Sequence, residues 1–345
     1  MEELKSDNEH LSSGVTTANS YSTDIRAINE MIQRESAFID ILKLEMDKVI
    51  VGQKYMVERL LIGLLADGHI LLEGVPGLAK TLAINTLSKA IQADFSRIQF
   101  TPDLLPADLL GTMIYNQKKE EFIVRKGPLF SNFILADEIN RAPAKVQSAL
   151  LEAMQERQVT IGDNTFPLPN PFLVLATQNP IEHEGTYRLP EAQLDRFLFK
   201  IEIKYPTLEE EIIILQNQHQ QKLGIELNAV KAVLSTAQIK TCRAIIKALH
   251  VEPKLIEYVA KIVHETRNNK SLYLGASPRA SLAMINSAKA IAAMQGRDFV
   301  TPEDIIKVAS PVLAHRIMLT PDKEMEGLTT SDIVAQIVQK IEIPR

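Results

Sequence analysis

A lysine and a threonine at the end of a run of small residues are the first candidates for chemistry. Residues Gly74 to Thr81 read G-V-P-G-L-A-K-T, which matches the phosphate-loop pattern G-x-x-x-x-G-K-[ST] except at the second glycine, replaced by Ala79. In such a loop, backbone N–H groups surround an anion at the start of a helix. Lys80 then contacts the terminal phosphates, and the Thr81 hydroxyl binds magnesium. The alternative is an ordinary strand–turn–helix junction with a surface lysine.

Two carboxylates form the second candidate group. Asp137 and Glu138 end an apolar run that is typical of a parallel strand covered on both faces. Carboxylates at the C-terminal end of such a strand lie where open α/β sheets bind ligands. One can hold hydrated magnesium, and the next can polarise an attacking water. An acidic cap after a core strand is the alternative, but the position of the pair after Lys80 favours a nucleotide hydrolase.

An amide follows another buried run, which ends at Thr177. Gln178 and Asn179 come next, and an amide at this place can orient a water molecule against a γ-phosphate. The alternative is an Asx turn that starts the Asn179–Pro180 bend. Val51 and Gln53, just before the helix that leads into the phosphate loop, are also assigned to nucleotide binding.

The hydrophobic pattern predicts the elements that must position these residues. Buried strands are expected at 70–72, 96–100, 132–138, 172–177 and 200–203, and helices at 25–50, 55–66, 82–91 and 142–157. The alternating segments 113–124 and 158–168 predict two β-hairpins. Residues 101–111, rich in Pro, Asp and Leu, are expected to lack regular structure. Helical patterning dominates from Thr207 onward, so the chain is predicted to be α/β up to about Pro206 and helical beyond it.

Composition limits the classes of function. The 345 residues suggest two domains, at 25–205 and 206–345, after a polar and loosely ordered tail at 1–24. A net charge of -5 argues against a general nucleic-acid or anionic-membrane surface. Cys242 is the single cysteine, which suits the cytoplasm. The sequence lacks a long apolar run and a signal peptide, so no membrane insertion is expected.

Taken in order, these motifs resemble those of the MoxR family of AAA+ ATPases. The segments that carry the resemblance are Gly74 to Thr81, Gln99 to Pro106, Asp137 to Ala142, Leu189 to Phe197 and Gly275 to Ser281. Ala79 is usual in this family, whereas Arg188 stands where members often carry proline.

The resemblance implies an AAA+ P-loop domain with a central parallel sheet, followed by a small all-helical C-terminal lid. It also implies a homo-oligomeric ring, commonly a hexamer, with ATP and Mg²⁺ bound between neighbouring subunits. Carried over by position, Asn179 is the first sensor, Arg196 is the arginine finger offered to the next subunit, and Arg279 is the second sensor. Whether Arg279 serves its own nucleotide or a neighbour's stays open. The binding set is Val51, Gln53, Gly74, Val75, Pro76, Gly77, Leu78, Ala79, Lys80, Thr81, Leu82 and Asp137, with Thr81 and Asp137 at the metal and Glu138 as the catalytic base.

The resemblance further implies chaperone-like remodelling or maturation of protein complexes, with partners that include proteins with a von Willebrand factor A domain. The two hairpins match insertions that face the centre of the ring. A magnesium-chelatase-like motor that inserts metal into a cofactor is the leading alternative, and a nucleic-acid motor is disfavoured by the acidic charge balance. A nucleotide-binding scaffold without hydrolysis is also possible in principle, although every catalytic residue type is present. A local ion pair with Asp195 is the structural alternative for Arg196, and His69 and His183 are expected to be structural.

Overall fold

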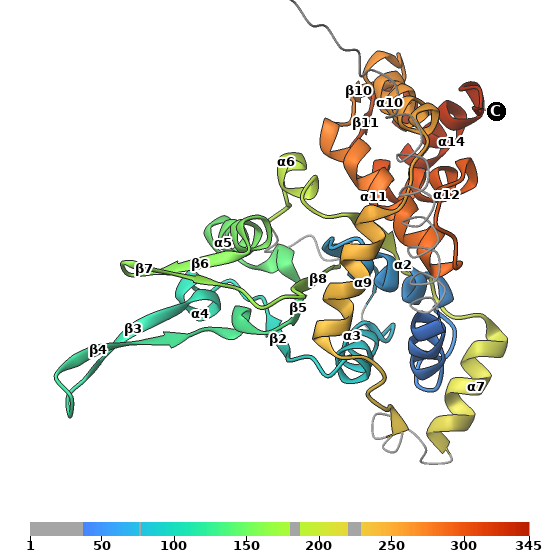
Figure 1. The fold of residues 1–345 in the computed structure, drawn as a ribbon. Helices are drawn as coiled ribbons and strands as arrows, with labels where there is room; N and C mark the ends of the chain where they lie inside the picture. Colours follow the sequence, from blue (N-terminus) through green and yellow to red (C-terminus); the bar gives the residue numbers. More distant parts are fainter. Residues whose placement is uncertain (1–36, 76, 180–186, 220–228, 345) are drawn as a thin grey trace, which may run out of the picture.

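The computed structural model describes residues 37–75, 77–179, 187–219 and 229–344. The predicted tail at 1–24, Pro76 of the phosphate loop and His183 lie outside these ranges. The first predicted helix is helical over residues 37–47. Figure 1 shows the chain folding into an α/β part with two projecting hairpins and a group of helices formed by the C-terminal third.

A five-stranded sheet forms the centre of the α/β part, in the order β2-β5-β8-β1-β9. The strands are β1 (Ile70–Glu73), β2 (Phe95–Gln99), β5 (Phe133–Asp137), β8 (Leu173–Gln178) and β9 (Phe199–Glu202). All neighbouring pairs run parallel, which confirms the predicted sheet. In this register Glu73 lies opposite Gln178, and Gln99 lies opposite Asp137. The ends of the strands that lead into the candidate residues therefore meet at one edge.

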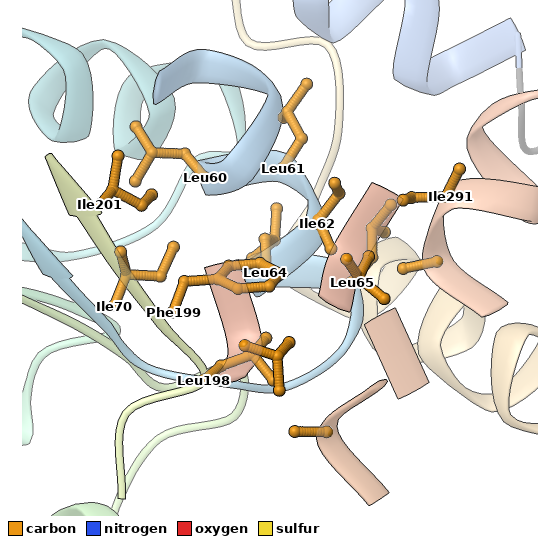
Figure 2. Packing of buried hydrophobic residues seen from close by; sticks show 14 of the residues in the cluster. Leu60, Leu61, Ile62, Leu64, Leu65, Ile70, Leu198, Phe199, Ile201 and Ile291 are labelled. Carbon is orange, nitrogen blue, oxygen red and sulfur yellow. The ribbon is translucent and has the colours of Figure 1, made fainter. Parts of the chain in front are cut away.

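Alternate residues of each central strand enter two separate apolar cores. On one face, Ile70 and Leu72 of β1 join a cluster with α2 (Lys54–Leu65), α3 (Lys80–Ala90) and the C-terminal helices. On the other face, Leu71 joins a second cluster with α4 (Pro106–Leu110) and α5 (Ala144–Glu156). Burial on both faces explains why the central strands are continuous apolar runs. Figure 2 shows Ile70 and Phe199 facing α2 in the first cluster.

The two predicted hairpins are present, and both extend away from the C-terminal helices (Figure 1). They are β3 (Gly111–Asn116) with β4 (Glu121–Lys126) and β6 (Gln158–Ile161) with β7 (Asn164–Pro167), each pair antiparallel. The expected irregular segment 101–111 contains the short helix α4, so that prediction was wrong in part. Pro106 starts α4, and Asp108 caps it by accepting the backbone N–H of Leu105 at 2.8 Å. The pattern was hidden because the helix spans only five residues.

The described residues beyond Pro206 are helical, as predicted, apart from one short pair of strands. Their helices are α7 (Leu208–His219), α9 (Thr236–Ala248), α10 (Pro253–Asn268), α11 (Pro278–Met294), α12 (Pro302–Leu313), α13 (Pro321–Met325) and α14 (Thr330–Lys340). The antiparallel strands β10 (Leu272–Leu274) and β11 (Met318–Leu319) were not predicted, because two or three residues carry no readable alternation. The boundary at Pro206 remains a prediction. No helix in the described ranges combines the length and apolar character needed to cross a membrane.

His69 links three elements at the end of the sheet opposite the phosphate loop. Its Nδ1 accepts the backbone N–H of Val174 in β8 at 3.0 Å, so Nε2 carries the proton and donates to the carbonyl of Met154 in α5 at 3.1 Å. The imidazole is buried and neutral. This arrangement supports the structural role predicted for His69.

We expect the free energy of unfolding to decrease as the pH is lowered below about 6.5, and His69 to account for part of this decrease. Burial, followed by the positive charge of Arg157, lowers the pKa of His69 well below its ordinary value. The unfolded chain therefore binds a proton that the native protein does not, which costs at most about 1.4 kcal/mol per pH unit. Urea unfolding of His69→Gln between about pH 7 and pH 5 should show a shallower dependence than the wild type. His250→Gln is the control, because its side chain is 67% exposed. Equal slopes for His69→Gln and the wild type would contradict the assignment.

Candidate active site

The phosphate loop connects β1 to α3, and three of its described residues have positive φ, the first being Gly74 at 158°. Gly77 has a φ of 86°, and Ala79, the N-cap of α3, has a φ of 57°. An alanine in this left-handed conformation is strained by roughly 1–2 kcal/mol relative to glycine. Ala79 thus adopts the left-handed backbone conformation that explains the glycine at this position of the general pattern. The departure from the pattern leaves the turn intact.

Lys80 is half-buried and lies against the loop. Its Nζ donates a hydrogen bond of 2.5 Å to the carbonyl of Gly74. Burial lowers the pKa of Lys80 from its ordinary value, and the carboxylates of Asp137 and Glu138 oppose this shift. Lys80 is therefore packed against the loop and not fully exposed, which favours the phosphate-loop interpretation. The ammonium group lies between the loop and the two carboxylates that the sequence paired with it.

A cavity of about 390 Å³ opens between the loop and the C-terminal ends of the strands. It brings together Lys80, the acidic pair and Asn179, which are far apart in the sequence. The described residues that line it are Gly74, Gly77, Leu78, Ala79, Lys80, Thr81, Leu82, Arg97, Gln99, Asp137, Glu138, Thr177 and Asn179. A loop of backbone donors with a lysine, beside a hydroxyl and a carboxylate, suits a phosphate chain with Mg²⁺. Val75 packs against the first apolar core instead.

Hydrogen bonds fix both carboxylates at the mouth of this cavity. Asp137 accepts from the Thr177 hydroxyl at 2.6 Å and from Nη2 of Arg97 at 2.6 Å. Glu138 has a φ of 55° and accepts from Nε2 of Gln99 at 2.7 Å and from Nη1 of Arg141 at 2.9 Å. Each carboxylate therefore has a cationic partner.

Sequence reasoning gave no role to Arg97, Gln99 or Thr177. Arg97 and Gln99 alternate on one side of β2, and β2 pairs with the strand that ends in Asp137. The alternation was visible, but the neighbour of β2 in the sheet was not. These residues could only be found once the strand order was known.

A second cavity, of about 650 Å³, lies between the α/β part and the C-terminal helices. The α/β side contributes Gln53, whose Nε2 donates to the carbonyl of Lys204 at 2.9 Å, and Glu73, which directly precedes Gly74. The helical side contributes Ser310, Pro311, Ala314, His315, Thr329, Thr330 and Ser331. The predicted residue Gln53 therefore lines a space that adjoins the phosphate loop. Val51 lies half-buried near it without lining it.

Arg196 and Arg279 lie together in a third cavity, of about 430 Å³, which contains none of the phosphate-loop residues that the structure describes. Asp195 pairs with Nε of Arg316 at 2.8 Å and with Nη1 of Arg279 at 3.6 Å, rather than with the adjacent Arg196. The alternative of a local Asp195–Arg196 ion pair is therefore wrong. Nε of Arg196 is buried and has no hydrogen-bond partner among the described residues.

Comparison with known proteins agrees with this architecture. Residues 69–199 match the family "ATPase family associated with various cellular activities (AAA)", and residues 264–337 match the AAA lid domain. The chain is 50% identical to the chaperone MoxR1 of Mycobacterium tuberculosis, over 87% of this chain and 81% of MoxR1. A crystal structure of a candidate ATPase from Cytophaga hutchinsonii is 48% identical and superposes with a TM-score of 0.85, covering 94% of this chain and 99% of that one.

The magnesium-chelatase alternative has weaker support. The 38 kDa magnesium-chelatase subunit of Acidiphilium rubrum is 25% identical over 62% of this chain. The identity to MoxR1 is twice the identity to this subunit, and the MoxR1 alignment covers more of the chain. This chain belongs to the MoxR family of AAA+ ATPases, with an AAA domain built on a central parallel sheet and a helical lid.

Proposed function

We propose that the protein is a ring-forming, Mg²⁺-dependent ATPase that remodels or matures protein complexes in the cytoplasm. One observation carries the ATPase part: Lys80, Asp137, Glu138 and Asn179 line a single cavity at the C-terminal edge of the sheet. The similarity to a protein named a chaperone supports the remodelling part. Neither a nucleic-acid partner nor a membrane is part of the proposal.

Within this proposal, each candidate side chain has a role in ATP binding or hydrolysis. Bound ATP and Mg²⁺ would supply the phosphoryl group and neutralise its charge. Lys80 and the loop from Gly74 to Leu82 would hold the phosphates, and Thr81 and Asp137 would hold the metal. Glu138 accepts the proton of the attacking water, which Asn179 orients. Gln53 contacts the rest of the nucleotide from the adjoining cavity.

The two arginines support a site shared between subunits. Arg196 and Arg279 lie in a cavity separate from the phosphate loop of their own chain. A guanidinium has to approach the γ-phosphate to stabilise transition-state charge. We therefore assign both arginines to the nucleotide of a neighbouring subunit, in a ring that is hexameric as in the family pattern.

The first hairpin offers an apolar surface for protein clients. Tyr115 on β3 and Phe122 on β4 face each other, with ring centroids 5.2 Å apart, and are 50% and 65% exposed. Exposed aromatic side chains are common at surfaces that bind proteins. This supports clients that contact the hairpins, and proteins with a von Willebrand factor A domain are the partner class that we propose.

The Glu138→Gln variant tests the proposal. The amide keeps the shape of the side chain but cannot act as a base, so hydrolysis should fall by at least about 100-fold while ATP and Mg²⁺ still bind. Affinity capture with ATP should then retain the client, which mass spectrometry identifies. The control is Glu257→Gln, on an exposed position of α10. Near-normal hydrolysis by Glu138→Gln would remove Glu138 from its role, and a capture that is the same with and without ATP would refute the remodelling function.

A further inference from the structure

Arg316, just beyond the end of α12, is buried against the segment that carries Arg196. Its side chain is 3% exposed. Nη2 donates to the carbonyls of Asp195 at 3.2 Å and Phe197 at 2.5 Å, and Nη1 donates to the carbonyl of Leu198 at 3.1 Å. The guanidinium therefore holds the backbone on both sides of Arg196.

The lid also contacts this segment through other side-chain atoms, besides the ion pair of Arg279 with Asp195 described above. Nε of Arg316 donates to Oδ1 of Asp195 at 2.8 Å, and the hydroxyl of Ser277 donates to Oδ2 at 3.0 Å. Nε2 of His315 lies 3.1 Å from the carbonyl of Phe197. The segment lies between the four-residue helix α6 (Glu191–Leu194) and strand β9, so these contacts hold a stretch without regular structure of its own. The position of Arg196 thus depends on side chains of the lid.

The same end of α12 also lines the cavity beside the phosphate loop. Pro311, Ala314 and His315 contribute to that cavity, and Arg316 is the next residue along the chain. Consecutive residues therefore contact two places: His315 lines the cavity that adjoins its own phosphate loop and also contacts Phe197, and Arg316 contacts the backbone that carries Arg196. The two places are therefore joined by adjacent residues of the lid.

We propose that Arg316 is a positioning residue for Arg196, through which the lid of one subunit sets the arginine presented to the next. The inference rests on the proposed function, in which Arg196 serves a neighbouring nucleotide. Arg316 acts by fixing the carbonyls of Asp195, Phe197 and Leu198 and the carboxylate of Asp195. It contacts no substrate, and its loss should impair a subunit as an arginine donor but not as a nucleotide site.

Mixed rings separate these two abilities. Arg316→Gln protein should bind ATP with near-wild-type affinity but hydrolyse it at least about tenfold more slowly, since an arginine finger contributes far more than that. Mixing it with Lys80→Ala subunits, which keep Arg196 in place, should restore turnover. Mixing it with Arg196→Ala subunits should restore none, because both partners lack a positioned arginine. Sedimentation must first show that mixed rings form. A defect in general folding would lower turnover equally in both mixtures.

Two controls keep the result specific. Arg297 is a partly buried lid arginine, paired with Asp304 at 2.8 Å, and its hydrogen bonds to described residues stay within the lid. Arg297→Gln should lower thermal stability, but the variant subunit should still supply Arg196 to a neighbouring site as well as the wild type does. If Arg316→Gln does not fold or assemble, Asp195→Asn weakens the same contact from the other side. Its turnover should likewise be restored by Lys80→Ala subunits and not by Arg196→Ala subunits. Arg316→Lys, with one point of contact instead of a planar fork, should recover little activity.

The reference mixture is Arg196→Ala with Lys80→Ala. If this mixture regains no activity, the shared-site function fails and the role of Arg316 fails with it. If it regains activity but Arg316→Gln and Asp195→Asn subunits supply Arg196 to a neighbour as well as wild-type subunits do, only the positioning role of Arg316 is overturned. Turnover of Arg316→Gln within twofold of wild type would have the same meaning.

Discussion

ATP binding should be lost in the Lys80→Ala variant. The Lys80 ammonium is the cation within the loop, held 2.5 Å from the carbonyl of Gly74, while the loop offers neutral N–H donors around it. Hydrogen bonds to a charged group are roughly twice as strong as neutral ones, and the half-buried position of Lys80 reduces screening by water. We expect the affinity for ATP, measured by calorimetry, to fall by at least about 100-fold, which corresponds to roughly 2.7 kcal/mol.

The control for this variant lies in the same helix. Lys89→Ala removes an exposed lysine near the end of α3, so it tests for a general effect of charge on nucleotide affinity. Its affinity should stay within a factor of about two of wild type, the range expected for exposed charges. Unchanged affinity in Lys80→Ala, with the fold preserved, would show that Gly74 to Thr81 is not the phosphate site.

Hydrolysis, rather than binding, should fail in the Arg196→Ala variant. In nucleotide hydrolases a guanidinium at the γ-phosphate increases turnover by about 10³-fold or more. Arg196 is in a cavity apart from its own phosphate loop, so its loss should leave ATP affinity unchanged. Wild-type turnover per subunit should also rise with protein concentration as rings assemble. Steady-state hydrolysis over a dilution series, with sedimentation in parallel, measures both effects.

Arg188→Ala is the matched control, because Arg188 is an exposed arginine a few residues before Arg196. It should keep both turnover and assembly. Activity per subunit that stays constant down to the monomer would exclude a site shared between subunits. Normal hydrolysis by Arg196→Ala would remove this residue from the reaction, whatever the state of assembly.

Strands and the residues at their ends were predictable because burial leaves a direct trace in the sequence. The run from Phe133 to Ala136 is buried on both faces, and its apolar composition stops at Asp137, where the strand reaches the cavity. The phosphate loop was equally readable, because its turns demand small residues at fixed spacing. Local physics therefore located Lys80, Asp137, Glu138 and Asn179.

The residues that sequence reasoning missed depend on which elements become neighbours. Arg97 contacts Asp137 only because β2 lies beside β5, and Thr177 contacts it only because β8 lies on the other side. Arg316 is harder still, because its partners are mostly backbone carbonyls, which any residue supplies. No composition or spacing marks such contacts. Strand order and lid placement come from the whole fold, and the sequence pattern does not encode them locally.

The apolar core shared by the sheet and the lid has a consequence for cooperativity. Ile62 and Leu65 on α2 belong to the same buried cluster as Ile291 on α11, and α2 contacts both α9 and α11 (Figure 2). Removing the lid would expose this face of α2 to water, at roughly 25 cal/mol for each Å² of apolar surface. The two parts should therefore unfold in one transition. We therefore expect lid motion during ATP hydrolysis to consist of small tilts about a preserved core, without detachment of the lid.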